Sequence, residues 1–578
     1  MGPSAGGRTI SQEAFEALVA ENMDDLGMDP EEALEDALQT LTLQGVDLSG
    51  IIKCIPGVSS TRDNPLIQTL DKLKDVAFST SNTSKDNAEV EEIVELLNKF
   101  YGLCSVEGTE NATIASRNGG VELLTRICSS FDVQFETTLV LAMKALSSIL
   151  HDAQSREIFQ QNGGPKVVAD ILSGNRKNPV ILDSSFSVVV AASTNDEILK
   201  ESFMELKIDE LILQILKEQP KDTLYSLYDA IRVLLTPDDT RVLASQNSTT
   251  ALHWTCNTQD SAHHTASSNH VRRVRLHQPL AIGHNHWQLQ LATAQLPVGL
   301  HVCAYAPWLD VHADALGELA CLHPLLHLRV LPLVRAVSFV CAGPFAYAYH
   351  CQAEGLTTVY GYARRFAKLG IADALVKALC DGLSSPILAS ACIALKAVAV
   401  NDEICKSISE SGGIDAILQC LDQSTEQNNK AIARVCCSLL SKLAGSDTNK
   451  TLIVEKGGLN CLMKLSSRFS EDPLVLQEIM SIITVLSLRS PENAASAVEA
   501  GVADFVLHAM QKFPTSYQLQ RQACFMIRNL VVRNPENRII LLSNGIEKLV
   551  RKAKVSHASC KDAATAALRD LGLDDYNT

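Results

Sequence analysis

The sequence lacks most of the short motifs that mark a catalytic or cofactor-binding site. Its 578 residues contain no G-x-x-x-x-G-K phosphate loop, no H-E-x-x-H zinc motif and no C-x-x-C pair. Outside residues 247–358 the only histidines are His151, His508 and His557, and no nucleophile is spaced to meet them. The sequence therefore predicts that the protein is not an enzyme and has no catalytic residue, no cofactor and no metal site.

Basic residues are also scarce. Fifty Lys and Arg stand against 66 Asp and Glu, which gives a formal net charge of -16. Nucleic acids and anionic membranes are bound by clustered positive charge, so we expect neither as a direct partner. The most apolar stretch, residues 322–350, contains Arg329, Arg335 and three prolines, which argues against a transmembrane helix.

Signs of secretion are missing as well. The first fifty residues carry eleven acidic residues and one basic residue, Arg8, with no apolar signal core. We therefore expect a cytoplasmic or nuclear protein that is not secreted. In such a reducing compartment, the seventeen cysteines are predicted to be small buried side chains rather than a disulfide framework.

What the chain does contain is a repeat with a period near 44 residues. Segments such as NGGVELLTRIC, SGGIDAILQCL and KGGLNCLMKLS share a glycine followed by apolar residues three and four apart. Successive intervals are 44 residues and, after a gap, 45, 43 and 44, for Gly120, Gly164, Gly413, Gly458, Gly501 and Gly545. Gly370 and Lys207 extend the series at intervals of 43.

Each unit of this repeat is predicted to hold three helices. The glycine, able to take a positive φ, ends one helix and turns the chain into an amphipathic second helix. A third apolar helix follows, and cap signals such as Ser490-Pro491-Glu492 then start the next unit. Three helices without strand alternation are typical of armadillo or HEAT repeats, and the glycine turn favours armadillo. The predicted fold is all-α, a right-handed α-solenoid of about eight units.

Three short motifs add a family resemblance. They are QGVDLSGIIK from Gln44, QACFMIRNLV from Gln522 and AALRDLGL from Ala566. Together they resemble the armadillo repeat-containing protein 6 family over residues 9–246 and 359–573. The resemblance implies an armadillo interaction protein and carries over no defined biochemical activity.

Residues 247–358 differ from the rest of the chain. They hold twelve of the fifteen histidines and all three tryptophans but no lysine, and neither helix nor strand periodicity persists in them. Without these 112 residues, the interval from Lys207 to Gly370 falls from 163 to 51. The predicted organisation is therefore an acidic helical segment (1–55), a linker (56–90), repeats (91–246), an insertion (247–358) and further repeats (359–573).

The histidine-rich insertion has three possible interpretations. A zinc site would draw on His263, His264, His284 and His286 with Cys256 or Cys303, but no recognised ligand spacing is present. A nucleic-acid arm would use Arg272, Arg273 and Arg275, which make a small field in an acidic chain. We favour the third, an insertion of low order that is compatible with non-coding sequence read through an unspliced or mispredicted junction.

The third helix of each unit is predicted to line the concave groove of the solenoid. The candidate groove residues are Lys144, Arg232, Lys396, Lys442, Arg528 and Asn529. If the cations point into the groove rather than decorating solvated faces, the fitting ligand is an acidic or phosphorylated segment. The predicted function is a non-enzymatic scaffold that binds a partner protein along this groove.

The alternative function is a nuclear transport adaptor that recognises a peptide signal. Armadillo adaptors of that kind hold the peptide backbone with a ladder of asparagines on the groove helices. Here only Asn529 stands at the expected position, and the other rungs are Ser148, Val190, Val233, Lys396, Lys442 and Val485. The sequence therefore favours the scaffold over the adaptor.

Overall fold

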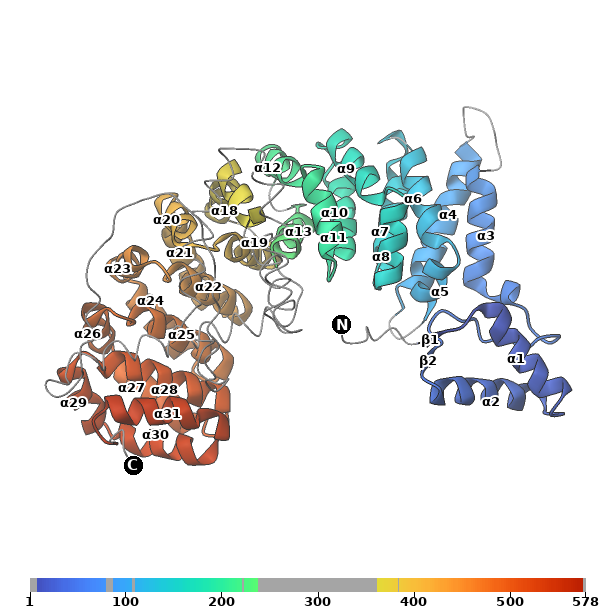
Figure 1. The fold of residues 1–578 in the computed structure, drawn as a ribbon. Coiled ribbons are helices and arrows are strands. Elements are labelled where there is room, and N and C mark those ends of the chain that lie inside the picture. The colour runs from blue at the N-terminus through green and yellow to red at the C-terminus, as the bar shows by residue number, and fades with distance from the viewer. Residues whose placement is uncertain are drawn as a thin grey trace, which may run out of the picture. The chain divides into compact units, whose positions relative to one another are not determined.

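The structure is a computed structural model that describes residues 8–78, 87–106, 110–131, 133–220, 223–236, 361–382 and 384–574. Within these ranges nearly all regular structure is α-helical (Figure 1). The exceptions are short 3-10 helices and one short parallel pair of strands, β1 (Arg8–Thr9) with β2 (Val46–Asp47). The predicted all-α fold class is confirmed, whereas the insertion at 247–358, with its histidines and arginines, lies outside the described residues.

The first two helices form a small module with a core of its own. Helix α1 (Gln12–Asp24) is capped by the Ser11 side chain, and α2 (Pro30–Leu43) is capped by Asp29 with Pro30 in its first turn. The buried core of this module consists of Phe15, Val19, Ala33, Ala37, Leu41 and Ile51. It is separate from the main hydrophobic core of the repeats.

Polar contacts join this module to the first repeat unit. Lys53 pairs with Glu110 at 3.1 Å, and Arg117 pairs with Asp47 at 3.1 Å. The Arg117 side chain lies directly over Gly50, where an added Cβ would come within 2.2 Å of its Cδ. Gly50 is therefore required for this close approach.

The predicted linker at residues 56–90, which was expected to hold one short helix, contains helical structure that packs into the repeats. Residues 61–63 form the 3-10 helix η1 (Thr61–Asp63), and α3 (Pro65–Phe78) is a 14-residue helix packed in the main core. Leu66, Leu70 and Leu73 are spaced for one helix face and are buried. Ser, Thr and Asn residues flank this helix on either side, and residues 79–86 lie outside the described ranges. Helix α4 (Asn87–Cys104) then leads into the repeats.

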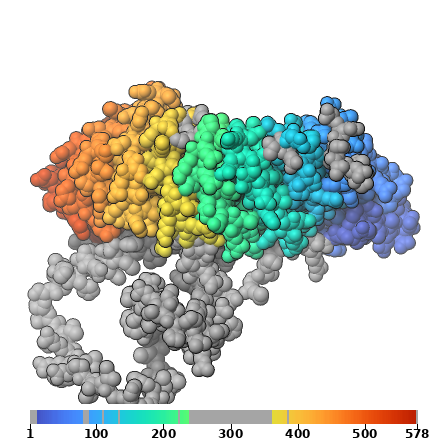
Figure 2. Space-filling view, turned by 90° about the horizontal axis from the view of Figure 1, so that it is seen from above, coloured from blue at the N-terminus to red at the C-terminus, as the bar shows by residue number. Residues whose placement is uncertain are grey.

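Eight three-helix units follow one another in the described part of the chain (Figure 1). Figure 2 draws the atoms of the same residues, coloured in chain order from blue to red. The first helices are α5 (Asn111–Arg117), α8 (Ala153–Gln161), α11 (Glu197–Glu205), residues 361–369, α20 (Asp402–Glu410), α23 (Asp447–Glu455), α26 (Pro491–Glu499) and α29 (Pro535–Ser543). The second helices are α6 (Gly120–Ser130), α9 (Gly164–Gly174), α12 (Ile208–Glu218), α18 (Ile371–Cys380), α21 (Gly413–Glu426), α24 (Gly458–Arg468), α27 (Val502–Lys512) and α30 (Ile546–Ser556).

The third helices complete each unit. They are α7 (Glu136–Ile149), α10 (Pro179–Ser193), α13 (Tyr225–Leu235), α19 (Ser385–Val398), α22 (Lys430–Leu443), α25 (Pro473–Leu486), α28 (Tyr517–Val531) and α31 (Lys561–Asp570). Short 3-10 helices, η2 (Val133–Phe135) and η4 (Ala558–Cys560), precede the first and last of them. Apolar side chains from all three helices of a unit meet those of the next unit in one continuous core.

The turn between first and second helices depends on a left-handed residue. It has φ between 69° and 98° in seven units, at Gly119, Gly163, Gly370, Gly412, Gly457, Gly501 and Gly545. In the third unit the same place is taken by Lys207, with φ of 60°. In each Gly-Gly pair the first glycine has the positive φ and turns the chain. The period in the sequence is counted from the second glycine, which begins the next helix. The second lies against the preceding helix; a Cβ on Gly458 would be 2.6 Å from the Ile453 carbonyl oxygen.

The chain segments on either side of the insertion are held by the same unit. The fully buried Lys200 of α11 donates a hydrogen bond of 2.7 Å from Nζ to the Thr236 carbonyl, just after α13 ends. Arg365, in the helix of residues 361–369, donates to the Met204 carbonyl at 3.1 Å and to Asp209 at 2.8 Å. Helices α13 and α19 then pack together as neighbouring third helices do elsewhere. The unit that ends at residue 236 and the unit that begins at residue 361 therefore pack against each other as other neighbouring units do.

Candidate partner-binding surface

The third helices from α7 to α31 form one continuous layer, because each packs against the third helix of the next unit. We call this the third-helix layer. One side of every helix is buried in the core, and the opposite side presents exposed or half-buried residues three or four apart. All six candidate groove residues belong to these helices. Their surroundings differ.

Three of the candidates are exposed lysines. Lys144 lies on α7, Lys396 on α19 and Lys442 on α22. Among the described residues, the ammonium groups of Lys144 and Lys442 take part in no ion pair or hydrogen bond. Lys396 Nζ donates a hydrogen bond of 2.7 Å to Ser438 Oγ on the neighbouring third helix, α22. These three lysines are accessible to a ligand.

The other three candidates make internal contacts. Arg232 Nε lies 2.6 Å from Asp229 Oδ1, one turn earlier in α13. Arg528 Nε lies 3.0 Å from Asp570 Oδ2, in a largely buried ion pair that joins α28 to α31. Asn529 is 5% exposed, and its Nδ2 donates a hydrogen bond of 2.8 Å to the Thr484 carbonyl of α25. These contacts give Arg528 and Asn529 a role in holding neighbouring units together.

The contacts of Arg528 and Asn529 do not follow from local sequence patterns, because their partners are distant in the chain. Asp570 lies 42 residues after Arg528, and Thr484 lies 45 residues before Asn529. Each separation is about one repeat period, so the partner stands at nearly the same level of the adjacent third helix. Comparing each polar residue with the residue one period away would have revealed both pairs.

Four charged side chains gather on the units that follow the insertion. Lys396, Arg434, Lys442 and Glu478 come from α19, α22 and α25, and we call them the Lys396 cluster. Lys396 is exposed, yet the protein around it desolvates the ammonium group and lowers its pKa; Glu478 opposes this shift, and the like charge of Lys442 adds to it. Burial raises the pKa of Glu478, and Lys396 and Arg434 oppose that shift. The four groups therefore interact electrostatically.

Apolar side chains are exposed on the same layer. Val180, Tyr225, Leu474 and Tyr517 each lie in the first turn of a third helix and are 47% to 49% exposed. A side chain of this kind at a recurring place in several units offers contact to an extended ligand. The third-helix layer therefore presents both charge and apolar area.

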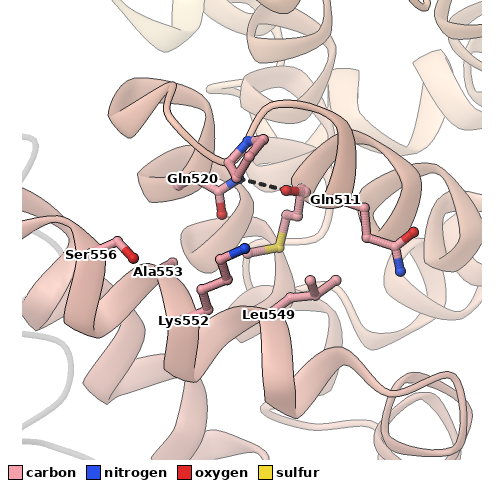
Figure 3. Close-up of a pocket in the computed structure, with 8 residues that line it drawn as sticks. Gln511, Gln520, Leu549, Lys552, Ala553 and Ser556 are labelled. Atoms are coloured by element: carbon pink, nitrogen blue, oxygen red, sulfur yellow. Dashed lines mark hydrogen bonds between the residues drawn. The ribbon is translucent and has the colours of Figure 1, made fainter.

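Two small cavities lie among the described residues. One cavity of about 130 Å³ lies between α27, α28 and α30, beside Lys552 and Leu549 (Figure 3). Its buried Gln520 is already engaged, because Nε2 donates to the Met510 and Phe513 carbonyls at 2.9 and 3.0 Å. A second cavity of about 170 Å³ lies beside Cys420 and Asn429. Sites for drug-sized ligands usually measure about 300–1,000 Å³, so neither fits a large cofactor.

The three histidines of the repeats make local structural contacts. His151 Nε2 lies 2.8 Å from Thr113 Oγ1, His508 Nδ1 lies 2.7 Å from the Asp504 carbonyl, and His557 Nε2 lies 2.8 Å from the Pro514 carbonyl. Across the described residues, no three His, Cys, Asp or Glu side chains are grouped to hold a metal ion. In the same part of the chain, no helix is both long and apolar enough to cross a membrane.

Comparison with known proteins agrees with the repeat architecture. Residues 7–86 match the model of the armadillo repeat-containing protein 6 N-terminal domain, and residues 353–573 match the LRRK2 ARM repeat model. Human armadillo repeat-containing protein 6 is 24% identical over 500 residues, covering 84% of this chain and 75% of the human protein. The chain is therefore similar to armadillo repeat-containing protein 6 over most of its length. The armadillo repeat-containing protein 6 homolog of Drosophila melanogaster is 22% identical to this chain, and the match covers 86% of this chain and 80% of the fly protein.

Solved structures are also similar to this chain. The crystal structure of an engineered protein covers 87% of this chain and 99% of its own, with 15% identity and a TM-score of 0.47. A designed armadillo repeat protein in complex with the peptide (KR)4 covers 38% of this chain and 94% of its own, with 19% identity and a TM-score of 0.33.

Proposed function

We propose that this protein is a non-enzymatic scaffold that binds a segment of a partner protein on the third-helix layer. The armadillo fold itself suggests protein binding. The observation that carries the proposal is the contrast between internal contacts and exposed groups within that layer. Arg528 and Asn529 hold neighbouring helices together, whereas Lys144, Lys396 and Lys442 remain accessible beside exposed apolar side chains. Such a mixed surface is suited to an extended protein segment.

The transport-adaptor alternative receives no support from these contacts. Its mechanism needs asparagine side chains free to hold a ligand backbone, and Asn529 already donates to Thr484. The scaffold is proposed to act in the cytoplasm or nucleus, with neither nucleic acid nor membrane as a direct partner.

Position-specific photo-crosslinking in cells tests the proposal. A photoreactive phenylalanine derivative would replace Tyr225 or Leu474 on the layer, and Ile198 or Ile539 on first helices as matched controls. All four side chains are exposed, so each replacement should be tolerated. We expect the two layer positions to crosslink to the same protein, identified by mass spectrometry, and the controls not to reach it. Adducts of equal yield from the first helices would contradict the proposal.

A further inference from the structure

The Lys396 cluster differs from the rest of the third-helix layer in how its charge is arranged. Helix α22 places Arg434, Ser438 and Lys442 four residues apart, so the three side chains form one stripe along the helix. At a rise of 1.5 Å per residue, this stripe is about 12 Å long. Lys396 reaches its centre from α19, where its amine donates to Ser438.

We infer that this stripe is a docking site for an extended, carboxylate-rich segment of a partner protein, with the acidic side chains meeting Arg434, Lys396 and Lys442. The inference rests on the proposed scaffold function and gives it a location and a ligand chemistry. About four residues of extended chain span the stripe, at roughly 3.3 Å per residue. A segment with acidic residues at alternate positions would therefore place carboxylates near both ends of it.

The positive charge of the cluster is not neutralised within the described residues. The guanidinium group of Arg434 and the ammonium group of Lys442 take part in no ion pair or hydrogen bond there, and no ion pair joins Glu478 to a cation of the cluster. Three cations against one carboxylate leave a local charge of about +2. Two other cations of the layer, unlike Lys144, are neutralised: Lys430 pairs with Asp472 at 3.2 Å, and Arg232 pairs with Asp229.

The size and surroundings of the stripe favour a peptide over other anionic ligands. Polybasic membrane-binding segments usually carry 4–8 Lys or Arg, and nucleic-acid surfaces also need many phosphate contacts. This stripe has three cations in a chain with a net charge of -16. The neighbouring helices also carry apolar side chains: half-buried Ile393 precedes Lys396 by one turn of α19, and Leu474 is 47% exposed one turn before Glu478 in α25. A peptide can supply both carboxylates and apolar groups.

Glu478 provides the most specific test, because its removal should strengthen binding. Its carboxylate competes with the ligand for the same cations and repels the ligand's own carboxylates. Glu478→Gln keeps the size of the side chain and removes the charge. A gain in affinity cannot result from partial unfolding, so this variant separates binding from stability.

The experiment uses the full chain and fluorescence anisotropy with three labelled ten-residue peptides. Each alternates Leu with one polar residue, which is Glu, Gln or Lys. We expect the Glu peptide to bind, and its dissociation constant to rise with salt. Lys396→Gln and Lys442→Gln should each weaken binding by about three- to tenfold, and Glu478→Gln should strengthen it by a similar factor. Lys144→Gln, which removes an exposed lysine before the insertion, is the matched control and should change nothing.

Several results would overturn the inference. These are equal binding of the Gln peptide, no binding of the Glu peptide at about 1 mM, or no gain from Glu478→Gln. Tighter binding of single-stranded DNA or of phosphatidylserine vesicles would identify a different class of ligand and would also reject it. Crosslinks from Tyr225 and Leu474 that persist unchanged in Lys396→Gln would reject this site alone. Absence of crosslinks from both positions would reject the scaffold itself.

Discussion

The repeat units before and after the insertion share one architecture but differ in how they use charge on the third-helix layer. In α10 and α13, Asp183 accepts a hydrogen bond from the Ser226 amide at 2.9 Å, and Asp229 pairs with Arg232. In α19 and α22, by contrast, Lys396, Arg434 and Lys442 outnumber the nearby Glu478. Buried apolar residues and left-handed turns are common to both regions. The fold is thus maintained by one set of positions, and the charge of the exposed surface varies through another.

The largest expected effect concerns the contact that joins the two regions. Arg365→Met would leave the fully buried Asp209 without its cation, at a cost of about 3–5 kcal/mol in the free energy of unfolding. Urea denaturation followed by circular dichroism measures this loss. Replacing both residues by apolar ones, in Asp209→Leu with Arg365→Met, should recover most of it. If Arg365→Met alone were as stable as the parent protein, the ion pair between Arg365 and Asp209 would not join the two regions.

The stability that Arg365→Met loses relative to the parent protein should increase with pH. Burial raises the pKa of Asp209, and Arg365 opposes that shift. Without Arg365 the folded-state pKa rises further above its unfolded value, so the carboxylate destabilises the fold most at high pH. The difference between variant and parent should shrink as pH falls towards the unfolded pKa. A difference that grows on acidification would contradict this assignment.

A smaller loss of stability is expected at a position of the third helices where the two regions carry different residues, Asn529 after the insertion and Ser148 before it. Asn529→Ala removes the hydrogen bond to the Thr484 carbonyl and should cost about 1–3 kcal/mol. Ser148 stands at the matching rung of the first unit and bonds only within its own helix, to the Ala145 carbonyl. Ser148→Ala should therefore change stability by less than about 0.5 kcal/mol. Asn529→Ala should leave the affinity for the acidic peptide unchanged, whereas a loss of affinity in a fully folded variant would give Asn529 a ligand-binding role.

The smallest effect is a gain in stability. Lys207 takes φ of 60° where the other described units have glycine, and its ion pair with Glu210 is exposed and contributes little. Lys207→Gly should relieve the strained backbone and stabilise the protein by about 0.5–1 kcal/mol. The reverse change, Gly163→Ala at φ of 69°, should destabilise it by about 1 kcal/mol. Thermal unfolding compares the two, and a loss of stability in Lys207→Gly would mean that its side chain matters more than its φ.

These positions also show what could be predicted from the sequence. The three-helix unit followed from the glycine period, because a helix end and a new apolar stripe recur with it. The exact left-handed residue in a Gly-Gly pair did not, since either glycine can take positive φ and only packing against residues such as Ile453 selects the second for the helix. One short helix was predicted within the linker, but its polar flanks gave no sign that the stripe of Leu66, Leu70 and Leu73 packs into the main core.

The candidate site was predicted less completely than the fold. Placement on the third helices followed from the cap signals, and exposure of Lys144, Lys396 and Lys442 agrees with the helical period. Which cations are neutralised depends on contacts between neighbouring units. Only Arg232 has its partner within one turn, at Asp229. For Arg528 and Asn529, the partner lies one repeat away and becomes evident only when the units are stacked.

Hydrogen exchange measured by mass spectrometry, with and without the alternating Glu and Leu peptide, tests the proposed binding site most directly. It reports each third helix of the full chain in one experiment. The proposal predicts slower exchange in peptides from α19, α22 and α25 on adding the ligand, and unchanged exchange in those from α7, α10 and α13. Equal protection in both regions, or protection only before the insertion, would contradict it.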